Sequence, residues 1–274
     1  MNPPRFFVPG ASIRREGGDG PGAAFSFSAV IAGDEAHHAV NVLRLGAGDP
    51  VVLIDGSGDE FWGAVERLAT GPGGPRVEVA GASIRRSPAE PPFEVLLVQG
   101  VPKGDKLEEI VEKGTEAGVT RFLPVYTERS VVRYAGDKAE KKRSRLERVA
   151  IGAAKQCRRG RAPAVLPFQD LEDAASGGLL DGLVWIAFWE GAAEPLRRVA
   201  ERIRARGRSG PNGFALFIGP EGGFAEREAR FLEGRGAHLA SLGPRILRTE
   251  TAGPIAAALL LYEFDDGGSG GIAP

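Results

Sequence analysis

Two glycine-proline loops that carry charged residues follow apolar strands near the C-terminal end of the sequence. The first is IGPEGG (residues 218–223). It lacks the Lys-Ser/Thr pair of a P-loop and the glycine spacing of a dinucleotide fold, and the charge of Glu221 would repel phosphates. Exposed amides could instead pair with an adenine edge, and a carboxylate favours a cationic ligand, which suits S-adenosylmethionine better than ATP or NAD. Taken alone, however, the loop favours the plain start of a helix near Phe224, with Glu226 and Glu228 at its positive end.

The second loop, LGPRILRTETAGP (residues 242–254), shifts this balance. Thr249 or Thr251 could cap the apolar helix that follows, and Pro254 is tolerable in a first turn. Capping does not explain why Arg248 and Glu250 flank Thr249, although an isolated arginine is usually a surface charge. Arg248 and Glu250 are therefore the candidates for chemistry.

The elements that position these loops change type along the chain. Residues 1–82 combine β-branched and aromatic residues with Gly, Pro and Asp breaks, which predicts a small β-rich barrel. The proline-rich segment 83–92 is a plausible linker. In residues 93–264 apolar strands alternate with amphipathic helices, which predicts an α/β domain with a mostly parallel sheet and ligands at the carboxyl ends of its strands. Residues 265–274 are expected to be a disordered tail.

The composition narrows the class of protein. The 274 residues are 42% hydrophobic and 26% charged with a net charge of −1, so overall charge does not indicate a polyanion partner. Cys157 is the only cysteine, which excludes an intrachain disulfide and favours a reducing compartment. No apolar run approaches the roughly 18 residues of a membrane span, and no signal pattern is found, so we expect a cytoplasmic protein. The adjacent His37 and His38 lack further Cys or His partners, and no metal site is expected.

Four stretches together resemble one known family. They are HHAVNVLRLGAGDPVVLIDGSGDEFWGAV, KGDKLEEIVEKGTEAGVTRFLPVYTERSVV, RLERVAIGAAKQCRRGRAP and FIGPEGGFAEREARFLEGRGAHLASLGPRILRTETA. In this order they are similar to the bacterial 16S rRNA uridine N3-methyltransferases of the SPOUT superfamily. The resemblance implies an N-terminal PUA-like RNA-binding domain and a C-terminal SPOUT domain with a deep trefoil knot. It also implies S-adenosylmethionine as cofactor, a homodimer, and 16S rRNA of the small ribosomal subunit as substrate.

The resemblance also implies the site residues. Arg248 and Glu250 would handle the uracil: Arg248 by stabilising charge near O2 or O4, and Glu250 as base or as the group that orients Arg248. Which of the two acts on the proton stays open. The cofactor contacts carried over are Trp189, Ile218, Gly219, Pro220, Glu221, Gly222, Gly223, Leu242, Gly243, Ile246, Leu247, Arg248 and Thr249.

RNA contact is expected to be largely electrostatic. The segment from Lys138 to Arg161 is strongly basic, with Glu140 and Glu147 its only acids, although a solvated helix face explains any single charge there equally simply. For His38 the alternative is a buried, hydrogen-bonded histidine. The expected RNA contacts are Arg5, His38, Arg44, Lys103, Arg129, Arg158, Arg159 and Arg161.

Two positions depart from the family pattern. Lys155 stands where the family usually has an acidic residue, so a role for that acid is not carried over. Pro254 is unusual in the last helix but is expected to fit its first turn. Two other functions share the fold: methylation of another RNA such as tRNA, and a non-enzymatic RNA-binding role in ribosome assembly. The intact GPEGG and LRTET loops argue against the second.

Overall fold

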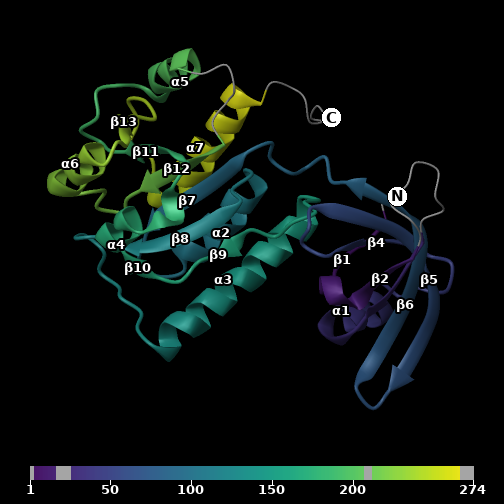
Figure 1. The fold of residues 1–274 in the computed structure, drawn as a ribbon. Helices are drawn as coiled ribbons and strands as arrows, with labels where there is room; N and C mark the ends of the chain where they lie inside the picture. The colour runs from purple at the N-terminus through teal and green to yellow at the C-terminus, as the bar shows by residue number, and fades with distance from the viewer. Residues whose placement is uncertain (1–2, 17–25, 207–211, 266–274) are drawn as a thin grey trace. The chain divides into compact units, whose positions relative to one another are not determined.

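The computed structural model describes residues 3–16, 26–206 and 212–265. The chain divides into two compact units (Figure 1). Unit 1 consists of residues 1–90 and 154–162, and unit 2 of residues 91–153 and 163–274. The predicted tail, 265–274, lies outside the described residues apart from Asp265.

Unit 1 is built on a six-stranded sheet in the order β1-β4-β5-β6-β3-β2. β1 pairs with β4 in parallel, and the remaining pairs are antiparallel. The predicted strand-rich N-terminal region is thus confirmed, and β6 runs four residues into the predicted linker. The elements of unit 1 are β1 (Arg5–Phe7), β2 (Ile13–Glu16), β3 (Ser26–Ile31), α1 (Gly33–His37), a π-helical turn (His38–Val42), β4 (Pro50–Ile54), β5 (Asp59–Gly71) and β6 (Gly74–Arg86).

The core of unit 1 follows from strand alternation. In β3, Phe27, Ala29 and Ile31 point inward while their neighbours are more exposed. They pack against Phe6 and Phe61, both fully buried, and the rings of Phe27 and Phe61 meet edge to face at 5.4 Å.

Unit 2 contains a seven-stranded sheet in the order β10-β8-β7-β12-β11-β13, with β9 beside β8. Every pairing in it is parallel, so the predicted α/β architecture is confirmed. Its strands are β7 (Glu94–Gly100), β8 (Arg121–Tyr126), β9 (Ala164–Val165), β10 (Gln169–Asp170), β11 (Val184–Phe188), β12 (Gly213–Ile218) and β13 (His238–Ala240). Its helices are α2 (Lys106–Glu116), α3 (Asp137–Gln156), α4 (Leu171–Ser176), α5 (Leu196–Arg206), α6 (Glu226–Gly234) and α7 (Thr249–Phe264). The last three residues of α3, 154–156, belong to unit 1.

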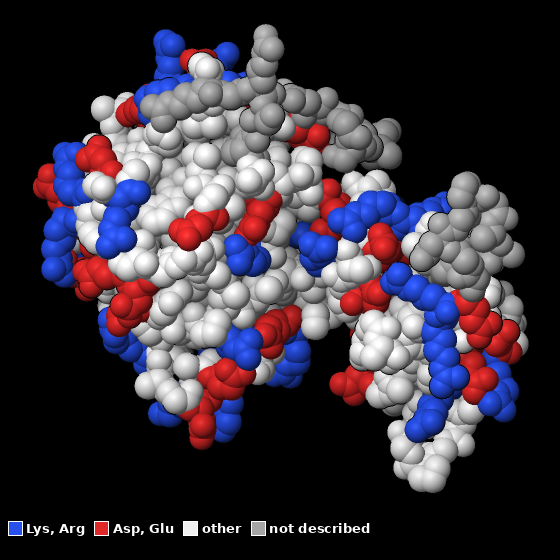
Figure 2. Space-filling view, viewed as in Figure 1, with Lys and Arg blue, Asp and Glu red and all other residues white. Residues whose placement is uncertain are grey.

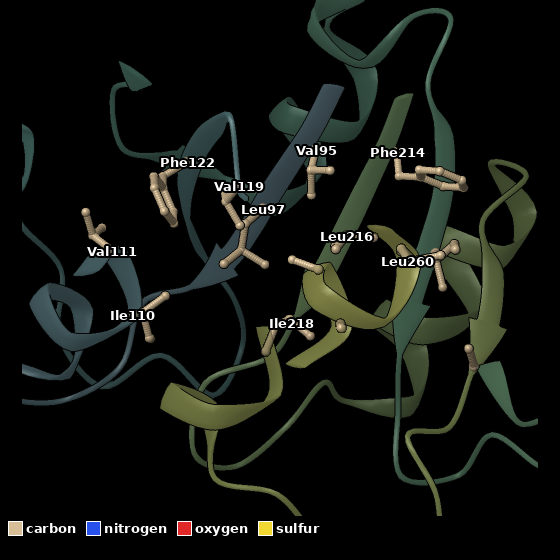
Figure 3. Close-up of a cluster of buried hydrophobic side chains, with 14 of the residues drawn as sticks. Val95, Leu97, Ile110, Val111, Val119, Phe122, Phe214, Leu216, Ile218 and Leu260 are labelled. Carbon is tan, nitrogen blue, oxygen red and sulfur yellow. The ribbon is translucent and has the colours of Figure 1, made fainter. Parts of the chain in front are cut away.

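Helices cover both faces of this sheet, which explains why its central strands are apolar without alternation. Val95 and Leu97 of β7 face a core shared with α2, α3, α5 and α7. Leu96 and Val98 face a second core with α4 and α6. Figure 3 shows the first core, where side chains of β7, β12, α2 and α7 meet.

The register of the strands decides where their following loops lie. Phe188 of β11 pairs with Ile218 of β12 and with Ala240 of β13, and Ile218 pairs with Gln99 of β7. The residues that come next in the chain therefore leave the sheet at one carboxyl edge. This edge is where a ligand site is expected in a parallel sheet.

Candidate cofactor and RNA site

The loop after β12 is held in one conformation by close backbone contacts. A Cβ atom on Gly219 would lie 2.6 Å from the carbonyl carbon of Gly223. A Cβ atom on Gly100, at the end of β7, would lie 2.6 Å from Cδ of Pro220. Since both approaches leave no room for a side chain, glycine is required at the two positions. The conformation of the predicted cofactor loop, Gly219–Gly223, thus depends on close backbone contacts that only glycine allows.

A buried hydrogen-bond network joins this loop to the start of α7. The hydroxyl of Thr249 donates to the carbonyl of Gly219 at 2.7 Å. The side-chain amide of Gln99 donates to Thr249 Oγ1 at 2.9 Å and to the Gly219 carbonyl at 3.3 Å. Gln99 is 1% exposed, and sequence reasoning missed it. The available signal was a lone amide near the end of the apolar strand FEVLLVQG.

The start of α7 differs from the prediction. The N-cap position is Arg248, which makes no side-chain capping bond, and Thr249 is the first residue of the helix. The expectation of a threonine cap is wrong, because the hydroxyl of Thr249 instead donates to the carbonyl of Gly219 in the loop after β12. The expectation that Pro254 lies in the first turn is also wrong: Pro254 is the sixth residue of α7. It cannot donate the usual hydrogen bond to the carbonyl of Glu250.

Glu221 ties the loop to the segment between β7 and α2. Its carboxylate accepts the backbone N–H of Lys103 at 3.1 Å and pairs with the ammonium of Lys106 at 3.1 Å. Burial alone would raise the pKa of Glu221, but hydrogen bonds from its own amide, Lys106 and Lys103 hold that pKa below its ordinary value. On the other side, the guanidinium of Arg129 donates to the carbonyl of Gly222.

The two predicted catalytic residues lie together but differ in exposure. The side chain of Glu250 is 8% exposed, whereas that of Arg248 is 85% exposed, and Arg248 Nη1 lies 3.9 Å from Glu250 Oε1. Glu250 Oε2 is buried and has no hydrogen-bond partner in the part of the chain that the structure describes; Lys106 Nζ lies 3.5 Å from it. The site therefore combines the buried carboxylate of Glu250, which has an unused acceptor oxygen, with the long cationic side chain of Arg248, which reaches into solvent.

The remaining residues predicted to bind the cofactor lie in loops that begin at the same edge of the sheet. Trp189 follows β11, packs over Gly191 and has the Arg230 guanidinium 5.6 Å from its ring centroid. Gly243 adopts φ +110°, a conformation that favours glycine, and Ile246 is 90% exposed. Leu242 and Leu247 are half-buried in the same stretch between β13 and α7.

The RNA candidates fall into three groups. Lys103 and Arg129 are exposed and flank the loop Gly219–Gly223 in unit 2, as their bonds to Glu221 and Gly222 require. In unit 1, His38 and Arg44 are exposed, which removes the buried-histidine alternative. Arg5 instead pairs at 2.8 Å with Glu60, a residue only 2% exposed.

The third group sits on segment 154–162 of unit 1. Arg159 is 1% exposed and pairs with Glu90 at 3.2 Å, so its side chain is not available to RNA as the sequence had predicted. Arg161 donates to the carbonyls of Gly56 and Ser57, and the carbonyl of Arg158 accepts the Ser87 hydroxyl. The composition of this segment predicted a basic surface. Instead, the side chains of Arg159 and Arg161 bind residues elsewhere in unit 1.

Lys155, the departure from the family pattern, also has a partner in unit 1. Its ammonium lies 2.6 Å from Glu35 Oε1. The charge at this position is thus neutralised by a carboxylate of α1.

Over the visible surface, acidic and basic side chains are interspersed (Figure 2), in keeping with the net charge of −1.

Within the described residues, no helix has both the length and the apolarity to cross a membrane. Across the same residues, no three His, Cys, Asp or Glu side chains gather in a way that could hold a metal ion.

Comparison with known proteins identifies the class of protein: the fold, with its site at the carboxyl edge of the sheet, is that of an RNA methyltransferase. A family model described as the RNA methyltransferase domain matches residues 89–261, and one described as the RNA methyltransferase PUA domain matches residues 31–69. Ribosomal RNA small subunit methyltransferase E of Bacillus subtilis is 34% identical over 237 residues, which cover 86% of this chain and 90% of that protein. The Mycobacterium bovis protein of the same name is 36% identical over 234 residues, covering 83% of this chain and 84% of its own.

A solved structure agrees with these sequence matches. Ribosomal RNA small subunit methyltransferase E from Neisseria gonorrhoeae, crystallised with S-adenosylmethionine, superposes with a TM-score of 0.77 at 26% identity, covering 96% of this chain and 98% of that chain. The chain belongs to the ribosomal RNA small subunit methyltransferase E family. The family resemblance drawn from the sequence is therefore confirmed.

Proposed function

We propose that this protein transfers the methyl group of S-adenosylmethionine to N3 of a uridine in 16S rRNA. The observation that carries the proposal is the carboxyl edge of the unit 2 sheet. There, the loops after β11, β12 and β13 leave neighbouring strands, and the loop after β12 is bonded to the start of α7. The buried carboxylate of Glu250 has one oxygen without a hydrogen-bond donor among the described residues. Relatives named for small-subunit rRNA methylation support the substrate class.

The residues at this edge fit the proposed cofactor. The loop Gly219–Gly223 is pinned by Gln99 and Thr249, so its backbone is preorganised to receive a flat heterocycle. Two carboxylates, Glu221 and Glu250, lie here with Lys106 and Arg248, so these four side chains carry no net positive charge that would attract a phosphate. We propose that this loop, Trp189 and the stretch Leu242–Thr249 hold the cofactor, which when bound supplies an electrophilic methyl group.

The chain's own residues then prepare the uracil. N3 carries a proton that must leave as the methyl group arrives, and we assign its removal to the Glu250 carboxylate, which has an acceptor oxygen without a hydrogen-bond partner among the described residues. Arg248 extends into solvent, where its guanidinium can stabilise charge that develops on O2 or O4. Alignment of the two reactants contributes about 7–11 kcal/mol in favourable cases. A charge-stabilising donor adds on the order of 3 kcal/mol.

The division of labour between the units is also a proposal. We assign RNA binding to residues 1–82 and methyl transfer to residues 93–264, with 83–92 between them. The exposed side chains that support RNA contact are His38 and Arg44 in unit 1, and Lys103 and Arg129 beside the cofactor loop. Arg5, Arg158 and Arg161 remain candidates, although Arg5 and Arg161 also make contacts within unit 1.

We further propose that unit 2 carries the deep trefoil knot of the SPOUT superfamily. After β13, the chain returns to the middle of the sheet. Thr249 bonds to the loop after β12, and Gly253 packs closely on Leu97 of β7. A chain that leaves the sheet edge and passes back against two central strands is the arrangement that such a knot needs.

A homodimer is the assembly that we propose. Residues 252–262 of α7 carry no charged side chain: Ala256, Ala257 and Leu260 face the core, while Leu259 and Tyr262 are 42% and 83% exposed. A helix that is apolar all round is normally buried on every side. A second copy of the chain packing on this stripe would cover it with the self-complementary geometry of a two-fold dimer.

The direct test is methyl transfer in vitro. The purified protein is incubated with S-adenosylmethionine labelled in the methyl group and with small ribosomal subunits from a strain that lacks N3-methyluridine. Digested nucleosides are then separated and identified by mass spectrometry. Label in N3-methyluridine from 16S rRNA supports the proposal. Label found only when tRNA is supplied would contradict the substrate, and no transfer to any RNA would contradict the activity.

A further inference from the structure

Lys106 lies between two carboxylates that come from distant segments of the chain. Its ammonium is 3.1 Å from Glu221 in the loop after β12 and 3.5 Å from Glu250 at the start of α7. Lys106 itself begins α2. Three elements therefore meet at one cation, and neither the family resemblance nor the motif spacing had singled it out.

Among the described residues, Lys106 and Arg248 form the ion pairs with Glu250, and they differ in how firmly they are held. The Lys106 side chain is 35% exposed and has two carboxylate partners, whereas Arg248 is 85% exposed and 3.9 Å away. The hydrogen bond with Glu221 raises the pKa of Lys106 above its ordinary 10.5, and the charges of Glu221 and Glu250 add to this. Lys106 therefore stays protonated throughout the physiological range.

The burial of Glu250 makes this contact different from an ordinary surface ion pair. Exposed pairs contribute little, about 0–1 kcal/mol. Removing the cation beside a buried carboxylate instead leaves a charge without compensation, which is strongly unfavourable. Without Lys106, the carboxylates of Glu221 and Glu250 would also repel each other, because no cation would lie between them.

We propose that Lys106 is a positioning residue for the methyl-transfer reaction, which fixes the Glu250 carboxylate against the cofactor loop and so leaves Arg248 free to meet the uracil. This inference rests on the proposed function, in which Glu250 and Arg248 act on the uracil. Lys106 does not need to touch either substrate. Its effect is to hold Glu250 through Oε2, the carboxylate oxygen 3.5 Å from Lys106 Nζ, while Oε1 lies nearer to Arg248.

The test compares Lys106→Met with the conservative Lys106→Arg and with Lys113→Met as matched control. Lys113 lies on the same helix and pairs with Glu109 on its exposed surface. For Lys106→Met we expect kcat to fall at least tenfold. Its Kd for S-adenosylmethionine should stay within about threefold of wild type, because Gln99, Thr249 and the Lys103 amide still hold the loop. Lys106→Arg should recover most of kcat, and Lys113→Met should match wild type.

A second readout does not depend on activity. Thermal unfolding of Lys106→Met, Glu250→Gln and the double variant forms a double-mutant cycle. We expect Lys106→Met to lower Tm by several degrees in the wild-type background and to have little further effect beside Glu250→Gln, because the neutral amide no longer needs the cation.

Three results would overturn the proposal: kcat of Lys106→Met within twofold of wild type, an equal loss in Lys113→Met, or fully additive Tm shifts. If wild-type protein transfers no methyl group, the proposed function fails separately, and the thermal cycle still decides whether Lys106 holds Glu250.

Discussion

Replacing Gly219 by alanine places a methyl group where the loop after β12 has no room. The new Cβ would lie 2.6 Å from the carbonyl carbon of Gly223 and 2.8 Å from the amide nitrogen of Phe224, compared with 3.4–4 Å for ordinary contacts. All the opposing atoms belong to the backbone, so no flexible side chain can move aside. The loop has to shift by roughly 1 Å, which also disturbs the bond from Thr249 to the Gly219 carbonyl.

The size of the effect follows from that displacement. Overpacking of this kind costs about 1–3 kcal/mol. If the free protein relaxes by moving the loop, the same free energy must be restored when the cofactor binds. At about 1.4 kcal/mol per tenfold, the Kd for S-adenosylmethionine should rise by about fivefold to about 140-fold.

Isothermal titration calorimetry with S-adenosylmethionine measures this directly, with Gly234→Ala as the control. Gly234 ends α6, is exposed, and has no atom within 4 Å of an added Cβ, so its variant should bind as wild type does. Circular dichroism checks that both variants are folded. A Gly219→Ala protein that is folded and binds within twofold of wild type would refute the assignment of this loop to the cofactor.

Three further predictions concern other parts of the site. Arg248→Ala should lower turnover on the order of a hundredfold while the Kd for S-adenosylmethionine changes only a few fold, since its side chain is 85% exposed; unchanged turnover would contradict its role. Leu259→Glu should convert the proposed dimer to a folded monomer in light scattering, and a persistent dimer would rule out the α7 stripe as the interface. The folded-state pKa of Glu221 lies below its ordinary 4.5, so its carboxylate stabilises the fold above about pH 4.5, and this is lost as pH falls through the lower folded pKa. The difference in Tm between wild type and Glu221→Gln should therefore shrink on acidification, and a constant difference from pH 7 to pH 3 would contradict the contacts assigned to Glu221.

Much of unit 2 could be predicted because its pattern is local. Apolar strands such as FEVLLVQG and FALFI, separated by amphipathic helices, indicate a parallel sheet buried on both faces, and the sheet has this form. The loops that follow such strands had to lie at one edge, which singled out Gly219–Gly223. Arg248 and Glu250 were singled out because helix capping does not explain their charges. Strand and helix periodicity alone did not indicate a knot.

The residues that were missed have partners far away in the sequence. Gln99 bonds to Gly219 and to Thr249, 120 and 150 positions later, and Lys106 resembles any charge on an exposed helix until its carboxylate partners are known. Arg159 looks like part of a basic surface, but Glu90, 69 positions earlier, holds it in the interior.

Local rules failed at the start of α7 for the same reason. A threonine before an apolar helix is a common cap, yet the hydroxyl of Thr249 bonds to the Gly219 carbonyl instead. Pro254 lies beyond the first turn, among buried residues of the helix. In both cases tertiary contacts outweigh the preference of the isolated helix.

The central claim, methylation of N3 of a uridine in 16S rRNA, is tested most directly in the cell. Nucleosides of 16S rRNA are quantified by mass spectrometry in a strain from which the gene for this protein is deleted and in the same strain carrying the gene on a plasmid. We predict that N3-methyluridine disappears from the deletion strain and returns with the plasmid, but not with a copy encoding Arg248→Ala. N3-methyluridine at its full level in the deletion strain would contradict the account.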